Sequence, residues 1–520
     1  MESILELLVL VVAMWPVLRL CASRAFLRKL RAFPGVAAAL TSLLALYGFL
    51  IVYLALYSPT YLRLIAILAF CALIYERWRA RPDYGHSRGL PPGPLTIAPL
   101  NPWRDHLFYQ KQAARYGPIF KMSHFLQPMV CVVGLKQALE LLRRYDDVLS
   151  VAPLPFNRFI PGGFLRYMDR ASHTVYRTTF HSAFTRDVIK SCEPFTVHAV
   201  RQELSHMAEC CSRAPATGIQ PADHLDRMLF VIFVRIFFGI PPDSEHFTRL
   251  QTLYRVIDFR NSARASYREV ISALDEVTVI IQQQIIRSLQ LMKQNEDLNC
   301  SFLAEIIRAD PRAAHDQTVL GNLIYILQTS WRDVAGLLLW TLKMLSDHPE
   351  WATRVREELA LSGKENDKES NCLASRIVME TLRLEQSEYL MRKVRTEIRF
   401  NGFVIPKGWL LRICIRESHR SAEVYENPDT FNPNRFLTHD YTRSEHSPFG
   451  ASRISCLGEH LTMTIGRIFV NELARGFDWK VVRDGPREFG GFHWKPSSKF
   501  RICVTSSLRA EKESEKAAHC

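Results

Sequence analysis

Apolar residues divide the chain into a membrane-like N-terminal part and a longer part with the periodicity of a globular protein. Pro34 to Tyr57 carries no charged residue and is long enough to cross a bilayer with some tilt. Two weaker apolar stretches flank it, Ile4 to Leu18 and Thr60 to Tyr75, and each can span, lie in the interface or pack on the first. We therefore expect an N-terminal membrane region of one to three helices within residues 1–82.

Residues 83–100 read as a proline-rich elbow, because adjacent prolines in "GLPPGPLTIAPL" resist both helix and strand. Residues 101–506 then show mostly helical patterning, with helices expected over 103–116, 136–145, 197–209 and 318–347. The last of these is apolar almost all round, which indicates a central, buried helix. Strand signals are fewer ("PIFKMSHF", "PMVCVVG" and "EIRFNGFVIPKGWLLRICI"), and residues 507–520 read as a polar tail. The expected fold class is mainly α with small β-sheets.

The formal net charge of +14 favours an anionic membrane surface or an acidic protein partner. Nucleic acid is excluded as a partner, because the basic residues are scattered and no nucleic-acid-binding signature occurs. Basic residues flank the apolar stretches at Arg24 to Arg31 and at Arg77 to Arg81. If all three stretches span, both clusters lie on one side, which the positive-inside rule places in the cytosol. The main domain is therefore expected to face the cytosol from a membrane.

Twelve cysteines occur without a CxxC pair, which indicates reduced thiols and no disulfide scaffold or zinc motif. Most are expected to be small apolar core residues. Cys456 has a different setting, the Gly/Ser-rich loop "SPFGASRISCLGEHLT", with a helix expected to begin near Glu459.

Two further segments complete a pattern with this loop. In "ETLR", Glu380 and Arg383 are three apart on a helical run, and "FNPNRF" contains Arg435 in a proline-punctuated loop. Taken alone, such a Glu–Arg pair is usually a solvated surface pair and a lone cysteine is usually core. Taken in order, ExxR, F-x-P-x-R-F and F-G-x-x-x-x-x-C-x-G resemble the cytochrome P450 superfamily, over roughly residues 90 to 505.

This resemblance implies a cytochrome P450 fold after the N-terminal transmembrane helices, and heme b held by Cys456 as the axial thiolate and only metal ligand. Thiolate donation to heme iron favours O–O cleavage, and a helix N-terminus stabilises a thiolate. The resemblance also assigns a ligand loop (Phe449, Gly450, Arg453, Gly458), a buried structural triad (Glu380, Arg383, Arg435) and cations for the heme propionates (His173, Arg177, Arg392).

The ligand loop departs from the family pattern. Where the family usually has Gly four residues before the cysteine and Arg two before, this chain has Ser452 and Ile454. Arg453 is the only nearby cation. Either it reaches a propionate from a shifted backbone, or His173, Arg177 and Arg392 perform that task.

The central helix departs further, because the family's A/G-G-x-D/E-T-T falls on Thr329 to Val334 and its acid–alcohol pair becomes Arg332–Asp333. Thr329, Arg332 and Asp333 are therefore the candidate catalytic residues. Asp333 can relay protons through water, or the substrate's own hydroxyl can assist. Arg332 can instead bind a carboxylate, as in the peroxide-using fatty-acid peroxygenases of this superfamily, or the site can serve an isomerase or dehydratase. Arg332 can also turn away and pair locally.

The resemblance implies a heme-thiolate monooxygenase that receives electrons from NADPH through a reductase and oxidises a lipophilic small molecule. We expect it to tailor a specialised metabolite (polyketide, terpenoid or similar) at a membrane, the endoplasmic reticulum if the source is eukaryotic. The alternatives are a peroxide-using or isomerase/dehydratase-type enzyme and a non-catalytic heme protein. Substrate contacts are expected from five segments, residues 151–168, 237–259, 328–333, 387–391 and 490–494.

Overall fold

The computed structural model describes residues 68, 71–72, 74–96, 102–124, 127–151, 157, 159–257, 266–294, 301–361, 372–386, 389–450, 453–490 and 493–507. The expected membrane spans Ile4 to Leu18 and Pro34 to Tyr57 lie outside these residues, as do most of Thr60 to Tyr75 and nearly all of the polar tail. Across the described part of the chain, no helix combines the length and apolarity that a bilayer crossing requires. The described residues form two compact units, one of 1–133, 144–150 and 391–414 and the other of 134–143, 151–390 and 415–520.

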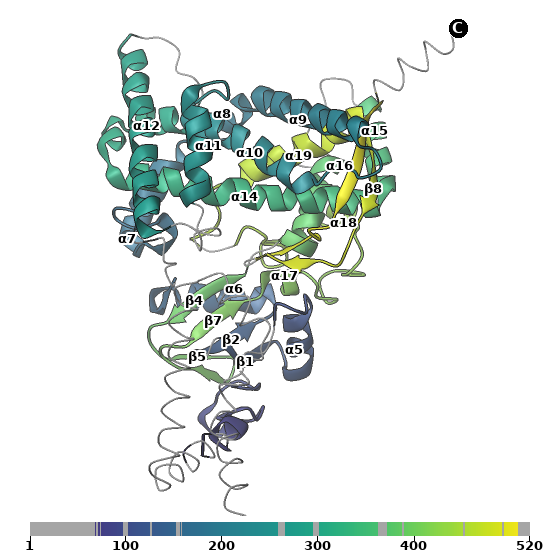
Figure 1. The fold of residues 1–520 in the computed structure, drawn as a ribbon. Coiled ribbons are helices and arrows are strands. Elements are labelled where there is room, and N and C mark those ends of the chain that lie inside the picture. Colours follow the sequence, from purple (N-terminus) through teal and green to yellow (C-terminus); the bar gives the residue numbers. More distant parts are fainter. Residues whose placement is uncertain are drawn as a thin grey trace, which may run out of the picture. The chain divides into compact units, whose positions relative to one another are not determined.

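The first unit is built on a five-stranded sheet in the order β1-β2-β7-β4-β3 (Figure 1). β1 and β2 pair antiparallel, β2 and β7 pair parallel, and β3 and β4 pair antiparallel. The elements of this unit are η1 His86–Arg88, α5 Phe108–Tyr116, β1 Ile119–His124, β2 Gln127–Val132, η2 Asp146–Val148, β3 Leu149–Ser150, β4 Leu390–Val394, β5 Ile398–Phe400, β6 Phe403–Ile405 and β7 Leu410–Ile413. The predicted strands are therefore present, but the helix expected from Trp103 begins only at Phe108, after a turn.

A buried lysine holds the proline-rich elbow against this sheet. Lys121 on β1 is 1% exposed, and its Nζ donates to the carbonyls of Pro91 at 2.7 Å and Pro82 at 3.0 Å. The backbone N–H of Lys121 also donates to Pro92, at 2.7 Å. Burial lowers the pKa of Lys121 to about 8. The backbone carbonyls of Pro82, Pro91 and Pro92, which have no helix or strand partner, thus all accept hydrogen bonds from Lys121.

The second unit is mainly helical. Its elements are α6 Leu135–Arg144, η4 Leu165–Tyr167, α7 Arg170–His181, α8 Arg186–Ser191, α9 Glu193–Arg213, α10 Pro221–Phe238, α11 Glu245–Ile257, α12 Tyr267–Lys293, α13 Phe302–Ala309, η5 Pro311–His315, α14 Gln317–Asp347, α15 Pro349–Leu361, α16 Leu373–Thr381, the π-helical turn η6 Leu382–Gln386, α17 Ile415–Ser418, α18 Arg435–Thr438, α19 Glu459–Gly476, β8 Phe477–Arg483, β9 Glu488–Phe489, β10 Trp494–Lys495 and β11 Arg501–Ser506. Two antiparallel pairs, β8–β11 and β9–β10, are its small sheets. The fold is thus mainly α with small sheets, as predicted.

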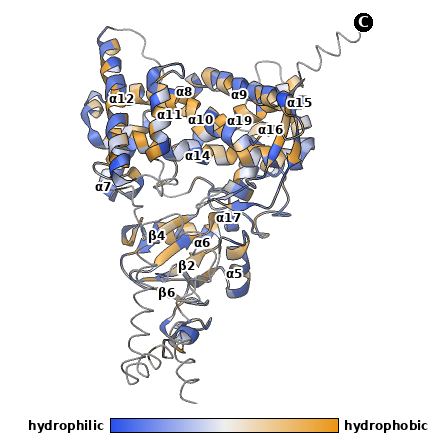
Figure 2. Cartoon of the chain, in the orientation of Figure 1, coloured by the Kyte–Doolittle hydropathy of each residue, from blue (hydrophilic) through white to orange (hydrophobic). Residues whose placement is uncertain are grey.

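The central helix is α14, within one residue of its predicted start. Asp316 caps it by accepting from the backbone N–H groups of Thr318 and Val319, at 2.7 and 3.3 Å. Its buried residues fall on every side of the helix, since Leu337 to Leu342 are all buried in succession. α14 packs against α10, α16 and α19, and Figure 2 shows the apolar residues of these helices in orange. A core of this kind supplies the rigid frame on which the candidate site stands.

Candidate active site around Cys456

The Cys456 thiol is presented to solvent just before the N-terminus of α19. Its backbone N–H donates to the carbonyl of Phe449 at 2.9 Å, which closes the loop. Gly450 has φ +77°, a left-handed conformation that favours glycine, and its N–H donates to Ser447 at 3.0 Å. The partial positive charge of the helix N-terminus favours the thiolate form of this sulfur.

Arg177 on α7 reaches the same loop. Its Nη1 donates to the carbonyl of Ser455 at 2.8 Å, and its Nη2 lies 3.3 Å from the Ser455 hydroxyl. Burial lowers the pKa of Arg177, and the negative charge of Cys456 opposes that shift. A cation therefore stands beside the thiol, although the position two before it holds Ile454.

Gly458 caps α19, two residues after the thiol. A Cβ added there would lie 3.8 Å from the Cys456 Sγ and 4.0 Å from Phe184, which are ordinary contact distances. Its φ of −84° also suits other residues. The chain itself therefore does not require glycine here, and the expectation that Gly458 makes room for heme stays a prediction.

The predicted triad forms a buried ion-pair network. Arg383 Nε and Nη2 donate to the two carboxylate oxygens of Glu380 at 2.7 and 2.8 Å, and both side chains are 0% exposed. Arg435, the first residue of α18, donates from Nε to Glu380 at 3.0 Å. The segment expected to be a loop is thus a short helix at this residue. The exposure excludes a solvated surface pair for Glu380 and Arg383.

His419 connects this network to the ligand loop. Arg383 Nη1 donates to the carbonyl of His419 at 2.8 Å, and the His419 ring Nε2 accepts from the backbone N–H of Ser447 at 3.0 Å. Burial holds the pKa of His419 well below its ordinary value, helped by the nearby charges of His446 and Arg383. A neutral imidazole is what this geometry needs, because a protonated Nε2 cannot accept.

A second arginine supports the loop from outside. Arg443 Nη1 donates to the carbonyl of Gly450 at 3.5 Å, and its Nη2 lies 3.3 Å from the Glu459 carboxylate at the start of α19. Arg453 is half-buried in the turn before the thiol, and Ser452 lies outside the described residues. The role expected for Arg453 stays a prediction.

The other two predicted propionate partners are both buried. His173 is 2% exposed on α7, one turn before Arg177 and on the same face of the helix. Arg392 is 4% exposed on β4 and donates from Nη1 to Met391 at 3.0 Å, within the sheet unit. Their contact with propionates stays a prediction.

On α14, Arg332 and its neighbour Trp331 share one carboxylate of α10. The Trp331 indole N–H donates to Asp226 Oδ1 at 3.0 Å, and Arg332 Nη1 lies 3.6 Å from the same oxygen. The Arg332 guanidinium also lies over the Trp331 ring, at 5.3 Å from its centroid. Arg332 thus pairs with a carboxylate of another helix, and whether its side chain turns away from heme stays a prediction.

Asp333 faces a histidine from a distant turn. His493 Nε2 lies 3.8 Å from Asp333 Oδ1, with the Asp333 side chain 42% exposed and that of His493 9% exposed. The Thr329 hydroxyl donates to the backbone carbonyls of Tyr325 and Ile326, both at 3.1 Å. Of the three candidate catalytic residues, Asp333 is thus the one that pairs with a titratable side chain from an expected substrate segment, His493 of residues 490–494.

Three of the expected substrate segments meet on α14. Asn322 accepts from the Leu165 N–H at 2.6 Å, and Gln328 Nε2 donates to the carbonyl of Ile257 at 2.7 Å. The turn before β10 contacts α14 through His493. Residues 493 and 494 therefore both contact α14. Residues 387–388 and 491–492 lie outside the described residues.

Comparison with known proteins decides the family. The pattern of the family described as Cytochrome P450 matches residues 91–504. The chain belongs to the cytochrome P450 family. It is accordingly an oxidoreductase, a cytochrome P450 monooxygenase, and membership implies a heme-thiolate centre.

Its relatives are distant. The chain is 25% identical to Cytochrome P450 26A1 of Xenopus laevis, over 78% of this chain and 88% of that protein. It is 23% identical to Abscisic acid 8'-hydroxylase 3 of Oryza sativa subsp. indica, over 80% of this chain and 87% of that protein. Among solved structures, retinoic acid bound cyanobacterial CYP120A1 aligns with a TM-score of 0.64 at 21% identity, covering 78% of this chain and 96% of that one.

The residues present in this cytochrome P450 fit heme. The outward-facing thiol of Cys456 would supply the sulfur ligand, and the cation of Arg177 stands beside it. Most other cysteines among the described residues are buried or half-buried, so exposure of this thiol sets it apart from all of them except Cys71. When heme is bound, its iron supplies the activation of oxygen. The chain's own contribution is to hold the sulfur, exclude water and orient the substrate.

Sequence reasoning missed several residues of this site: His419, Arg443, Ser455 and Asp226. His493 lies in the expected substrate segment 490–494, but its pairing with Asp333 was not predicted. His419 stands inside a segment between two recognised motifs, yet no local spacing shows which backbone group its ring accepts from. Asp226 and His493 meet α14 only through the tertiary fold. A basic cluster was missed as well, in which burial raises the pKa of Glu385 but Arg416, Arg487 and Arg420 bring it below its ordinary value.

Proposed function

We propose that this cytochrome P450 uses O₂ and electrons from NADPH, delivered by a reductase, to oxidise a lipophilic small molecule. The observation that carries the proposal is the pairing of Arg332 with Asp226. A guanidinium matched by a carboxylate of its own chain is a poor anchor for a substrate carboxylate, because Asp226 would repel the second negative charge. The peroxide-using alternative depends on that anchor, so this pairing favours the reductive route.

Asp333 and His493 are the groups that we propose hold and move a proton in place of the family's acid–alcohol pair. Their nearest atoms are 3.8 Å apart, a separation that small side-chain movements or one water can bridge. The Asp333 side chain is in contact with solvent, and that of His493 is largely buried, so the pair connects solvent with the interior. A proton taken up at Asp333 can thus be passed to His493.

The substrate that we propose is a terpenoid-sized or polyketide-sized lipophilic molecule that this enzyme tailors in specialised metabolism. An aromatic cluster packs in the core near the loop, with Phe184 close to Gly458. Phe184, Phe237 and Phe302 lie with centroids 4.5 to 6.2 Å apart. Abscisic acid and retinoic acid, which appear in the names of two similar proteins, are both lipophilic terpenoids. These features together support a lipophilic terpenoid-like skeleton.

We propose further that the chain is anchored in a membrane with its catalytic domain facing the cytosol. Tyr75 and Trp78, in the helical residues 74–79, are 47% and 46% exposed and stand among the basic residues Arg77, Arg79 and Arg81. Exposed aromatic rings beside arginines are typical of the boundary between a bilayer and water.

Product analysis with two oxidant systems tests this function. Purified heme-loaded enzyme is incubated with a lipophilic compound library, either with NADPH and a reductase or with hydrogen peroxide alone. We expect oxygenated product only with the reductase. Product formed with peroxide alone would contradict the proposal and favour the peroxygenase alternative.

A pair of variants on α14 tests the proton route. We expect Asp333→Asn to lower the turnover rate by about 100-fold, because a positioned acid–base group contributes on that order. Asp347→Asn, on the same helix in an exposed pair with Lys343, serves as the matched control and should leave turnover unchanged. Equal activity of the Asp333→Asn variant and its control would remove Asp333 from the reaction.

A further inference from the structure

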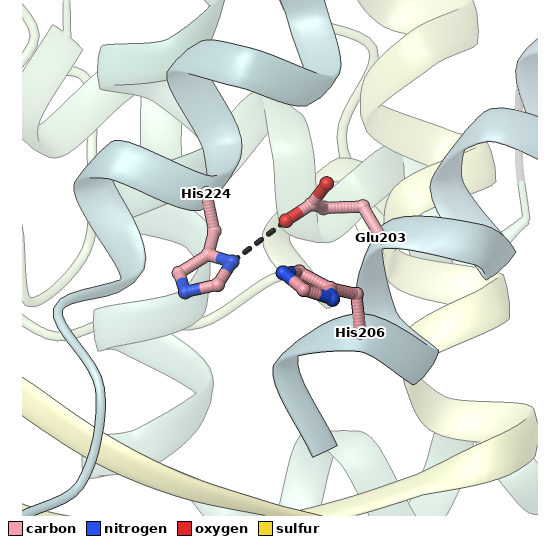
Figure 3. A group of neighbouring side chains, drawn as sticks. All are labelled: Glu203, His206 and His224. Carbon is pink, nitrogen blue, oxygen red and sulfur yellow. Dashed lines mark hydrogen bonds and ion pairs between the residues drawn. The ribbon is translucent and has the colours of Figure 1, made fainter. Parts of the chain in front are cut away.

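A cluster of metal-ligating side chains lies between α9 and α10, on elements other than the Cys456 loop (Figure 3). On α9, Glu203, His206 and Cys210 are spaced three and four residues apart and therefore share one face of the helix. His224, in the second turn of α10, points toward the same place.

The donor atoms of the cluster lie close enough to converge on one ion, although the hydrogen bond between His224 and Glu203 must open for both to bind it. One ligand atom from each of Glu203, His206 and His224 lies within 4.8 Å of the other two. His224 Nδ1 is 2.6 Å from Glu203 Oε1, and the two imidazole centroids are 5.6 Å apart. Cys210 Sγ is 3.6 Å from His206 Nε2. Donor atoms around a tetrahedral zinc ion, with bonds of about 2.0–2.3 Å, stand about 3.3–3.6 Å from one another.

We propose that Glu203, His206 and His224 bind a zinc ion that joins α9 to α10. The donor set decides the metal class. Two imidazoles and one carboxylate, with a thiol beside them, suit Zn²⁺, whereas Ca²⁺ and Mg²⁺ prefer sites made of oxygen ligands.

Arg227 is the charged group that faces the cluster from α10. Its Nε donates to Glu203 Oε2 at 3.2 Å, and its Nη2 contacts Glu203 Oε1. Arg227 Nη2 also lies 3.2 Å from His224 Nδ1, so an ion bound by Oε1 and Nδ1 must displace Nη2, while the Nε bond to Oε2 can stay. These contacts with Arg227 and His224 orient the carboxylate before the metal arrives.

The ion would cross-link two helices that follow one another in the chain and pack side by side. α9 also packs against α19, the helix that begins at the Cys456 loop. Since zinc binds the folded cluster and has no such site in the unfolded chain, occupancy stabilises the folded state.

Zinc titration of the full heme-loaded chain tests the proposal. The protein is first treated with a chelator, and ZnCl₂ binding is then measured by calorimetry and by the thermal unfolding midpoint. We expect one zinc ion per chain at this site, with a raised midpoint. His224→Gln and His206→Gln should each weaken this binding event about tenfold or more and abolish the rise in the midpoint.

Two features keep the result interpretable. His198→Gln, on the same helix but exposed and outside the cluster, is the matched control and should bind zinc as the unaltered chain does. His206→Gln spares the Glu203–His224–Arg227 hydrogen bonds, so it is expected to fold even if His224→Gln does not, and the reduced–CO spectrum verifies the fold of each variant. Zinc binding of equal stoichiometry and affinity in the unaltered chain and in His206→Gln would overturn the proposal, as would no binding by the unaltered chain. The cluster would then be a metal-free hydrogen-bond network.

Discussion

The ligand loop with its buried triad and the middle of α14 both belong to the helical unit, but they are built in different ways. In the triad beside the Cys456 loop, Arg383 and Arg435 both pair with Glu380, and the three side chains are 0–5% exposed. All three residues belong to motifs that are recognisable in the sequence. Around Arg332 and Asp333, half-exposed charges are matched by single residues from remote elements, Asp226 and His493.

The difference follows from the cost of leaving a buried charge without a partner. In the triad every donor must be satisfied, so few residue types are compatible and the motif stays recognisable. On α14 the charges keep contact with solvent, which lowers that cost and lets the residue types change. The loop and triad assigned to cofactor binding are thus recognisable from sequence, and the α14 residues that we propose take part in the reaction are much less so.

The largest expected effect tests the ligand loop. Cys456→Ala should abolish the reduced–CO absorbance band typical of thiolate heme, because no other described thiol is presented at the N-terminus of α19. Absorbance spectroscopy of the purified variant measures this. Retention of the band would show that another group is the ligand. Cys71→Ala, which removes the other exposed thiol among the described residues, is the control and should keep the band.

The triad is expected to show the next largest effect. Glu380→Gln keeps the side-chain shape but leaves the charges of Arg383 and Arg435 buried and unmatched, at a cost of about 3–5 kcal/mol in the free energy of unfolding. Urea unfolding and heme content measure the loss. Glu276→Gln, in an exposed pair with Arg249, should cost about 1 kcal/mol or less. Similar losses in the two variants would contradict the contrast between buried and exposed pairs.

Acid should weaken the ligand loop before it affects α14. Burial lowers the pKa of His446 to about 3, and that of His419 lies well below its ordinary value. The unfolded chain therefore takes up protons that the folded chain refuses, and stability is complete above about pH 6.5 and falls as the pH drops toward about 3. The expected loss is about 1.4 kcal/mol per pH unit for each histidine.

The measurement is the thermal unfolding midpoint, together with the reduced–CO band, from about pH 7 to about pH 5. His446→Gln should give a shallower dependence on pH, while the exposed His198→Gln should not change it. A midpoint that is constant over this range would show that these two histidines do not stay neutral.

The smallest effect is expected on α14. Asp226→Asn keeps an acceptor for Trp331 and removes the partner of Arg332, at a cost of about 1 kcal/mol or less, because both charges are partly exposed. Arg332→Ala should weaken carboxylate and neutral ligands to the same degree in spectral titrations. A selective loss for carboxylates would instead make Arg332 a substrate anchor.

Local pattern predicted the helices well where it was strong. The expected starts of α14 and α19 agree with the structure to within a residue, because an apolar periodicity and a loop boundary coincide there. The helix expected from Trp103 begins five residues later, since the residues before Phe108 form a turn. Pairings such as Asp226 with Trp331, 105 residues apart, depend on how α10 packs on α14 and have no local signature.

The same distinction holds at the candidate site. The triad of Glu380, Arg383 and Arg435 was recognisable only through its resemblance to the family's motifs, since the Glu–Arg pair taken alone predicts a surface pair. The link through His419 was not readable, since its ring accepts from a backbone N–H 28 residues further on, and a backbone group leaves no mark on the sequence. The motifs therefore identified the charged residues of the triad. They did not identify the hydrogen bonds through His419 that connect the triad to the Cys456 loop.

One oxygen of Asp226 pairs with both Trp331 and Arg332 on α14. Substitutions at these three positions therefore depend on one another. An acid in place of Arg332 would set two carboxylates against each other, and we expect selection then to remove the acid at position 226. The two positions should change together among related enzymes. Ancestral reconstruction of this lineage should accordingly find substitutions there in pairs, with Trp331 retained only while position 226 keeps an acceptor.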